Sequence, residues 1–264
     1  MGEPEPDGTR EAKEKTVDRE DEEGFPVVGL GASAGGLAAL EQFLGEVPVD
    51  SGMAFVVVQH RPPDQESKLV RILQNETPLE VQPAEDGATV EPNHIYVIPP
   101  ARDLSIEGGV FRVSKHREKR RGAPSTIDYF FESLAEAYGR RAAGVILSGT
   151  GSDGSLGLKA IKEQGGFVLA QDASDAEYGG MPRSAVETGL VDVVGPAEEL
   201  AEQVLAIFEI ADRQAVPDAE AELADVQEQA LVEILRMLRK RTGNDFEQYK
   251  RATLMRRITR RMQV

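Results

Sequence analysis

VVGLGASAGG, residues 27–36, joins a short apolar run to a turn of small residues, and this stretch decides the fold. The apolar run predicts a strand over 27–30, and apolar residues at helical spacing in 37–44 predict a helix. Ser33 lies in the turn between them. A strand, a tight turn and a helix in this order are the first unit of an α/β fold with a parallel sheet.

The same alternation continues along the chain. Residues 54–59, AFVVVQ, form a β-branched run typical of a strand with both faces covered. Further strands are expected over 79–81, 94–98, 104–113 with a hairpin turn at Gly108-Gly109, 143–147, 167–170 and 191–194. Helices are expected over 67–74, from 124–128 to about 139, over 155–164, from 181–184 and over 197–210. The fold class is therefore α/β: a doubly wound, mostly parallel sheet with helices on both faces, plus a short C-terminal α-helical segment.

Composition narrows the class of protein. The chain has 264 residues, of which 40% are hydrophobic, enough for one α/β domain and a smaller piece. It has no cysteine, which excludes disulfides, thiolate catalysis and cysteine zinc sites, and fits a cytoplasmic protein. No apolar run reaches the roughly 18 residues of a membrane helix, so no direct membrane insertion is expected. A formal net charge of -16 argues against nucleic acid as a partner.

Changes in composition divide the chain into four parts. Residues 1–24 are almost entirely charged or small, which predicts a disordered tail. Residues 25–210 hold all the strand signals and form the expected catalytic domain. A linker is expected over 211–222, where Pro217 breaks the chain, and a helical segment over 223–264.

Three polar residues follow apolar runs: Ser33, His60 and Asp153. The carboxyl ends of parallel strands share one edge, where open α/β folds place their sites. These residues have the chemistry of a serine hydrolase, in which serine attacks, histidine takes its proton and aspartate orients the histidine. The alternative for Asp153 is a cap on the helix that begins near Ser155. The other histidines, His94 and His116, fit a strand residue and a solvated residue.

The turn around Ser33 fits two motifs. GASAG, residues 31–35, matches the G-x-S-x-G nucleophile elbow, in which small neighbours let the serine oxygen project from a sharp turn. Gly29, Gly31 and Ala34 also fit the dinucleotide fingerprint G-x-G-x-x-A. That fingerprint expects an acid near the end of the second strand, about 20 residues further on. Here that strand ends in Gln59 and His60, which disfavours a dinucleotide-binding module.

Taken together, these motifs resemble the chemotaxis receptor methylesterases, the CheB catalytic domain, over about residues 25–210. The resemblance rests on GASAGG at 31–36, QH at 59–60 followed by prolines, EDG at 85–87, HIYVIP at 94–99, APSTID at 123–128, LSGTGSDG at 147–154 and GMPRSA at 180–185. It implies Ser33 as nucleophile, His60 as base and Asp153 as orienting acid, with backbone support from Ala34, Thr150 and Gly151 at the oxyanion. It also implies a protein-glutamate methylesterase, with glutamine deamidation as a second activity, that needs no cofactor or metal. The implied partners are methyl-accepting chemotaxis receptors or related signalling proteins; the alternative is an inactive signalling scaffold of the same fold.

The chain departs from the family pattern at three points. Ala34 replaces a frequent threonine, and Thr150 replaces a frequent methionine, although backbone amides at both positions can still serve. The family's phosphorylated receiver domain has no counterpart in residues 1–24. We therefore expect activity that does not respond to small phosphodonors.

The C-terminal segment resembles a second family. TGNDFEQYKRATLMRRI, residues 242–258, is similar to the N-terminal helical region of the chemoreceptor methyltransferases, CheR. This similarity implies a longer parent protein with methyltransferase or regulatory domains. The alternative is a docking or dimerisation element.

Overall fold

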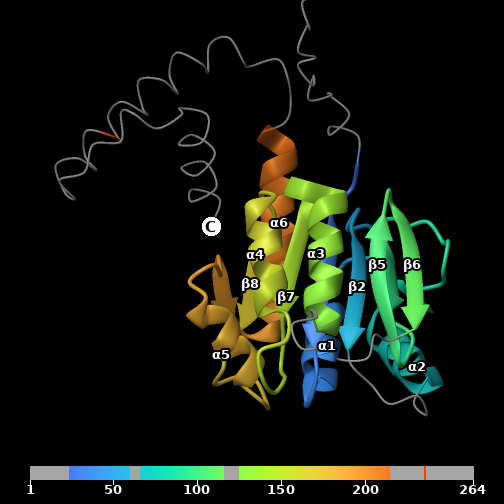
Figure 1. The fold of residues 1–264 in the computed structure, drawn as a ribbon, viewed down its shortest axis with the longest axis horizontal. Helices are drawn as coiled ribbons and strands as arrows, with labels where there is room; N and C mark the ends of the chain where they lie inside the picture. The colour runs from blue at the N-terminus through green and yellow to red at the C-terminus, as the bar shows by residue number, and fades with distance from the viewer. Residues whose placement is uncertain (1–23, 60–65, 116–124, 215–234, 236–264) are drawn as a thin grey trace, which may run out of the picture.

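The computed structural model describes residues 24–59, 66–115, 125–214 and 235. Within them, seven parallel strands form one sheet in the order β3-β4-β2-β1-β7-β8-β9 (Figure 1). The strands are β1 (Val27–Ala32), β2 (Ala54–Gln59), β3 (Glu80–Pro83), β4 (His94–Val97), β7 (Ala142–Ile146), β8 (Phe167–Gln171) and β9 (Val193–Gly195). The α/β class with a mostly parallel sheet is thus confirmed. Of the predicted tail over 1–24, only Gly24 is described, and of the predicted helical segment over 223–264, only residue 235. Of the predicted linker over 211–222, residues 211–214 are described, and they are helical.

A two-stranded hairpin supplements the sheet. β5 (Arg102–Glu107) and β6 (Val110–Lys115) pair antiparallel, from Arg102 with Lys115 to Glu107 with Val110. Gly108 and Gly109 form the turn with φ of 57° and 76°. Two consecutive residues of positive φ suit the tight hairpin turn that Gly-Gly predicts.

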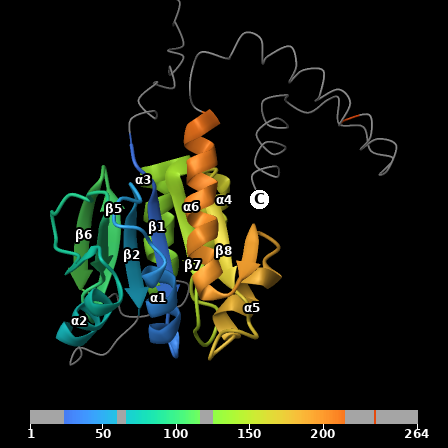
Figure 2. The same cartoon turned by 180° about the vertical axis from the view of Figure 1, so that it is seen from behind.

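Helices cover both faces of the sheet. One face carries α1 (Gly36–Gly45), α2 (Glu66–Glu76) and α6 (Ala197–Gln214), as Figure 2 shows. The other face carries α3 (Thr126–Tyr138), α4 (Ser155–Glu163), α5 (Gly180–Glu187) and the hairpin. A short 3-10 turn, Gly139–Arg141, links α3 to β7. Because β1, β2, β7 and β8 are buried on both faces, their sequences are continuously apolar rather than alternating.

The strand order creates a switch point beside β1. After β1 the chain moves to β2 and toward the β3 edge, and it later returns to place β7 on the other side of β1. β1 and β7 are in register from Val27 opposite Ala142 to Gly31 opposite Ile146. The loops that follow these two strands are therefore neighbours, and open α/β sheets bind their ligands at such a point.

β9 begins later than the sequence predicts. A strand was expected over 191–194, whereas the structure has it at Val193–Gly195. Asp192 is instead held by its side chain, which accepts hydrogen bonds from Lys162 Nζ and from the backbone N–H of Val168. No helix among the described residues is long and apolar enough to cross a membrane.

Candidate active site

Ser33 is the first residue after β1 and begins the turn into α1. Its backbone N–H donates to the carbonyl oxygen of Ser148 at 2.9 Å, which joins the turn to the end of β7. Its carbonyl oxygen accepts from Gly36 N–H at 3.0 Å and from Gln59 Nε2 at 3.0 Å. The turn is thus fixed from β2 on one side and from β7 on the other. The Ser33 side chain is half-buried and its Oγ makes no hydrogen bond with another described residue.

The small residues of the motif have a packing reason. Gly35 has a φ of 66°, which a residue with a Cβ rarely adopts, and it precedes α1. A Cβ at Gly35 would lie 2.8 Å from the Cβ of Glu177 and 2.8 Å from Cδ2 of Tyr178. A Cβ at Gly36 would lie 2.7 Å from the Cβ of Ala32. The sharp turn is therefore pressed between its own strand and the loop that follows β8.

Ser148 links the nucleophile turn to that loop. Its side chain is only 1% exposed. Its Oγ donates to the Ala34 carbonyl oxygen at 3.0 Å and accepts from Tyr178 N–H at 3.0 Å. Its backbone N–H donates to Gln171 Oε1 at 2.9 Å. One buried hydroxyl thus connects the loops after β1 and β8.

Backbone N–H groups of the predicted oxyanion residues lie in the loops that follow β1 and β7. Ala34 is half-buried, and Thr150 and Gly151 are exposed. Their N–H groups make no hydrogen bond to another described residue. By contrast, Gly149 N–H donates a hydrogen bond to the carbonyl oxygen of Tyr178 at 2.9 Å. Unpaired donors beside a serine are what a developing oxyanion requires.

Asp153 lies in the loop before α4, but it does not cap α4. Its Oδ1 accepts from Ser125 Oγ at 2.5 Å and from the backbone N–H groups of Ile127 at 3.1 Å and Asp128 at 3.2 Å, all at the start of α3. The α4 cap position is Gly154, with no side-chain cap, and Asp128 Oδ1 serves the N–H groups of Leu156 and Gly157 at 2.9 Å each. The helix-cap alternative was therefore attached to the wrong helix.

Burial raises the pKa of Asp153 above its ordinary value, and the charge of Asp128 raises it further. Hydrogen bonds from Ser125 and from the two N–H groups act in the opposite direction. Asp153 Oδ2 makes no hydrogen bond with another described residue. One carboxylate oxygen is thus anchored while the other has no partner within the described ranges.

His60 lies outside the described residues, so its predicted place between Ser33 and Asp153 stays a prediction. The residue before it, Gln59, is described and reaches the Ser33 carbonyl oxygen. The end of β2 therefore lies beside the nucleophile turn. Of the other histidines, His94 is the first residue of β4, and its Nδ1 lies 2.8 Å from the carbonyl oxygen of Pro92. His116 lies outside the described residues.

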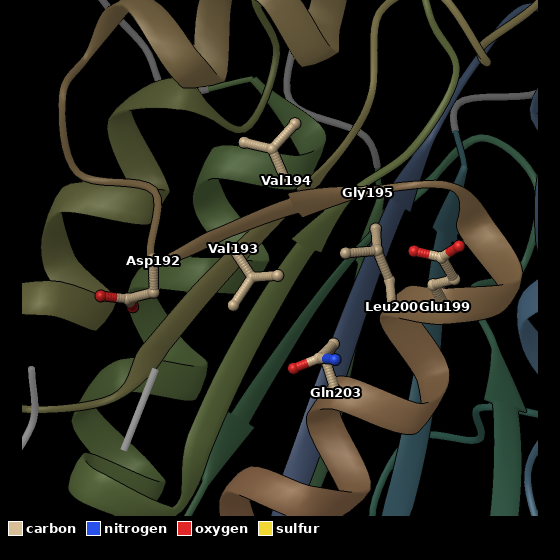
Figure 3. A pocket seen from close by; sticks show the side chains of 7 residues that line it. All are labelled: Asp192, Val193, Val194, Gly195, Glu199, Leu200 and Gln203. Carbon is tan, nitrogen blue, oxygen red and sulfur yellow. The ribbon is translucent and has the colours of Figure 1, made fainter. Parts of the chain in front are cut away.

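A separate hollow of about 350 Å³ opens between β9 and the start of α6 (Figure 3). It is lined by Asp192, Val193, Val194, Gly195, Glu199, Leu200 and Gln203. It contains no serine or histidine, and Asp192 is already held by Lys162. Within the described ranges, no three or more acidic or histidine side chains gather in a way that could hold a metal ion.

Sequence reasoning missed four polar residues that shape the site: Gln59, Ser148, Ser125 and Asp128. The available signal was a polar residue directly after, or at the end of, a buried apolar run. Gln59 ends β2, and Ser148 follows the buried Leu147 after β7. Ser125 and Asp128 lie in APSTID, residues 123–128, one of the motifs that carry the family resemblance.

The fold and the turn define the class: an α/β protein with a doubly wound sheet and a sharp serine turn at its switch point. Residues 28–204 match the family model described as CheB methylesterase, and residues 229–264 match the model described as CheR methyltransferase, all-alpha domain. The chain belongs to the CheB methylesterase family.

Individual relatives agree with this assignment. The protein-glutamate methylesterase/protein-glutamine glutaminase of Moorella thermoacetica is 40% identical over 188 residues, covering 70% of this chain and 44% of the relative. The protein of the same name from Desulfotalea psychrophila is 32% identical over 197 residues, covering 72% of this chain and 54% of the relative. The chain thus spans about half the length of these relatives.

A solved structure matches the described domain. The crystal structure of the Thermotoga maritima CheB methylesterase catalytic domain is similar with a TM-score of 0.63 and 32% identity. The match covers 69% of this chain and 97% of that one.

Proposed function

We propose that this domain is a protein-glutamate methylesterase that hydrolyses methylated glutamate side chains of chemoreceptors. The observation that carries the proposal is the Ser33 turn. It is fixed between Gln59 and Ser148, in a chain of the CheB family, and the N–H groups of Ala34 and Thr150 have no hydrogen-bond partner among the described residues. The names of the two relatives support the same activity and a glutaminase activity.

The proposed reaction begins with attack by Ser33 Oγ on the γ-carbonyl carbon of the ester while His60 takes the hydroxyl proton. Negative charge develops on the carbonyl oxygen, where the N–H groups of Ala34 and of Thr150 or Gly151 can donate. The C–O bond to the methoxy group then breaks, and His60 returns the proton so that methanol leaves. Water attacks the acyl-enzyme with His60 as base, which releases glutamate and restores Ser33.

Asp153 has the role of the orienting acid in this scheme. Its Oδ1 is held by the backbone N–H groups of Ile127 and Asp128 at the start of α3, so the direction of the carboxylate is set before substrate binds. Its Oδ2 is the oxygen proposed to accept from the His60 ring. A glutamine side chain would react by the same acyl transfer, with ammonia as the leaving group.

The match to the CheR all-alpha domain at 229–264 supports a parent protein that joins esterase and methyltransferase modules. Such a protein would add and remove methyl groups on the same receptors.

The test is methanol release from a methylated receptor cytoplasmic fragment by the chain and its variants. Ser33→Ala and His60→Gln are each expected to lower kcat by about 10⁴ to 10⁶ and to leave the fold intact. Ser114→Ala on β6 and His94→Gln on β4 are the matched controls, expected to keep most of the activity. Retained turnover in Ser33→Ala would overturn the mechanism. A wild-type chain that binds receptor but releases no methanol would support the scaffold alternative.

A further inference from the structure

Two carboxylates meet at one serine hydroxyl where α3 and α4 begin. Ser125 Oγ lies 2.5 Å from Asp128 Oδ2 and 2.5 Å from Asp153 Oδ1. Asp128 is only 4% exposed and Asp153 is half-buried. A hydroxyl has one proton, so it can donate to only one carboxylate at a time. When both acids are ionised, the other contact brings two oxygens together with no proton between them.

The backbone prevents either carboxylate from turning away. Asp128 Oδ1 accepts from the N–H groups of Leu156 and Gly157, and Asp153 Oδ1 accepts from those of Ile127 and Asp128. These four N–H groups belong to the first turns of α4 and α3, where no intrahelical acceptor exists. Rotation of either side chain would take the acceptor away from two of these helix N–H groups, which disfavours the rotation. The crowding of the two acids is therefore part of the helix junction.

We propose that Asp128 is a positioning residue that, through Ser125, sets the pH below which Asp153 loses its charge and the esterase loses activity. This inference rests on the proposed function, in which Asp153 orients His60. As pH falls, the junction gains a proton that relieves the contact around Ser125. A neutral Asp153 can no longer stabilise the imidazolium of His60, so catalysis fails on the acid side.

Other charges near the junction are few among the described residues. Asp128 is the charged group that raises the pKa of Asp153, after the larger effect of burial. Glu132, one turn further along α3, also has a raised pKa, first through burial and then through Asp128. On α4 the first cation is Lys159, which is exposed and pairs with Glu163, with Nζ 3.6 Å from Oε1. His60 and the basic run at 116–121 lie outside the described residues, so titrations at low and high salt are included in the test.

Two substitutions shift the Asp153 titration in opposite directions. In Asp128→Asn, Oδ1 keeps the α4 N–H groups while Nδ2 can donate to Ser125 Oγ, whose proton then serves Asp153. This removes both the charge and the proton deficit, so the pKa of Asp153 should fall. In Ser125→Ala, Asp153 loses a donor that stabilises its charged form, so its pKa should rise.

The experiment measures two quantities on the full chain. The carboxyl ¹³C shift of Asp153, assigned from its loss in Asp153→Asn, is titrated by NMR, and the acid limb of kcat/KM is measured with an ester substrate. Asp128→Asn should lower both midpoints by about one unit, Ser125→Ala should raise both, and the exposed control Glu136→Gln should move neither. The inference is wrong if the NMR midpoint of Asp153 does not change in Asp128→Asn. It is also wrong if that midpoint changes but the acid limb of kcat/KM stays where it was. If the wild type lacks esterase activity the proposed function fails, while the NMR titration still decides the coupling of the two acids.

Discussion

The side-chain amide of Gln59 donates to the carbonyl oxygen of Ser33 at 3.0 Å, across 26 positions of sequence. Gln59 is the last residue of β2 and Ser33 the first after β1, and the two strands pair in parallel with Ala32 opposite Gln59. The bond therefore joins the ends of β1 and β2 at the turn that carries the proposed nucleophile. It also fixes the backbone from which residue 60 follows.

Gln59→Leu is expected to impair catalysis more than stability. The Ser33 carbonyl oxygen keeps its bond from Gly36 N–H, so the free energy of unfolding should fall by only about 1 kcal/mol. The Ser33 turn and the end of β2 lose the hydrogen bond that joins them, and a displacement of about 1 Å can cost about 100-fold in rate. Steady-state kcat and the melting temperature measure the two effects, with the exposed Gln164→Leu as control. Unchanged kcat would show that the bond does not position the site.

Ser148→Ala tests the hydroxyl that joins the loops after β1 and β8. The substitution leaves the Ala34 carbonyl oxygen and the Tyr178 N–H without this partner, and each buried group can cost about 1–3 kcal/mol. In a domain of this size, each kcal/mol corresponds to about 2–4 °C in melting temperature. We expect a clear drop in melting temperature together with a lower kcat, because Ala34 N–H is a proposed oxyanion donor. A calorimetric scan of wild type and variant, compared with the exposed Ser174→Ala, checks this. A variant as stable and as active as the wild type would contradict it.

The sheet could be predicted because most of its strands are runs of consecutive apolar residues. β2 has its predicted limits, β1 and β8 end two residues and one residue later than predicted, and β7 is shifted by one residue at both ends. These runs are apolar because the strands are buried on both faces, so neighbouring sequence suffices. The start of β9 was missed because Asp192 bonds to Lys162 and Val168, which lie 30 and 24 positions away.

The site could be predicted only in part. Ser33 could be predicted because its turn requires small residues at fixed positions, and these all fall within ten consecutive residues, 27–36. Ser148 bonds to Gln171, 23 positions away, and to Ala34, 114 positions away. The partners of Asp128 within α4 lie 28 and 29 positions away. Such contacts depend on strand order and helix packing, which local patterns do not encode. The capping of α3 by Asp153 has the same origin.

Asp153→Asn should change how stability depends on pH. The folded-state pKa of Asp153 is raised above 3.8, so its stabilising contribution is complete below that value and is lost as pH rises through the raised pKa. Asparagine does not titrate and retains an oxygen for the α3 N–H groups. The melting temperature of the variant minus that of the wild type should therefore be higher at pH 7 than at pH 3.5. The kcat of the variant should fall by about 10⁴. Thermal scans across this range, with the exposed Glu187→Gln as control, give the comparison. If this difference in melting temperature instead falls toward pH 7, the native site stabilises the charged form of Asp153.

A chain that ends at Gln214 should keep the esterase fold and activity. Both core clusters of the described residues are built from positions between 25 and 208, and α6 contributes its buried residues from Ala197 to Phe208. All proposed catalytic residues precede position 154. We therefore expect the melting temperature to change by less than about 2 °C, the shift that a loss of under 1 kcal/mol would produce. With a small purified substrate, methanol release per molecule should match that of the full chain.

The comparison uses the two proteins side by side, each with a Ser33→Ala counterpart to define the background rate. A much lower melting temperature in the shortened chain would show that residues 215–264 pack on the α/β domain. A lower kcat at unchanged stability would instead show that they contribute to the site or to receptor binding.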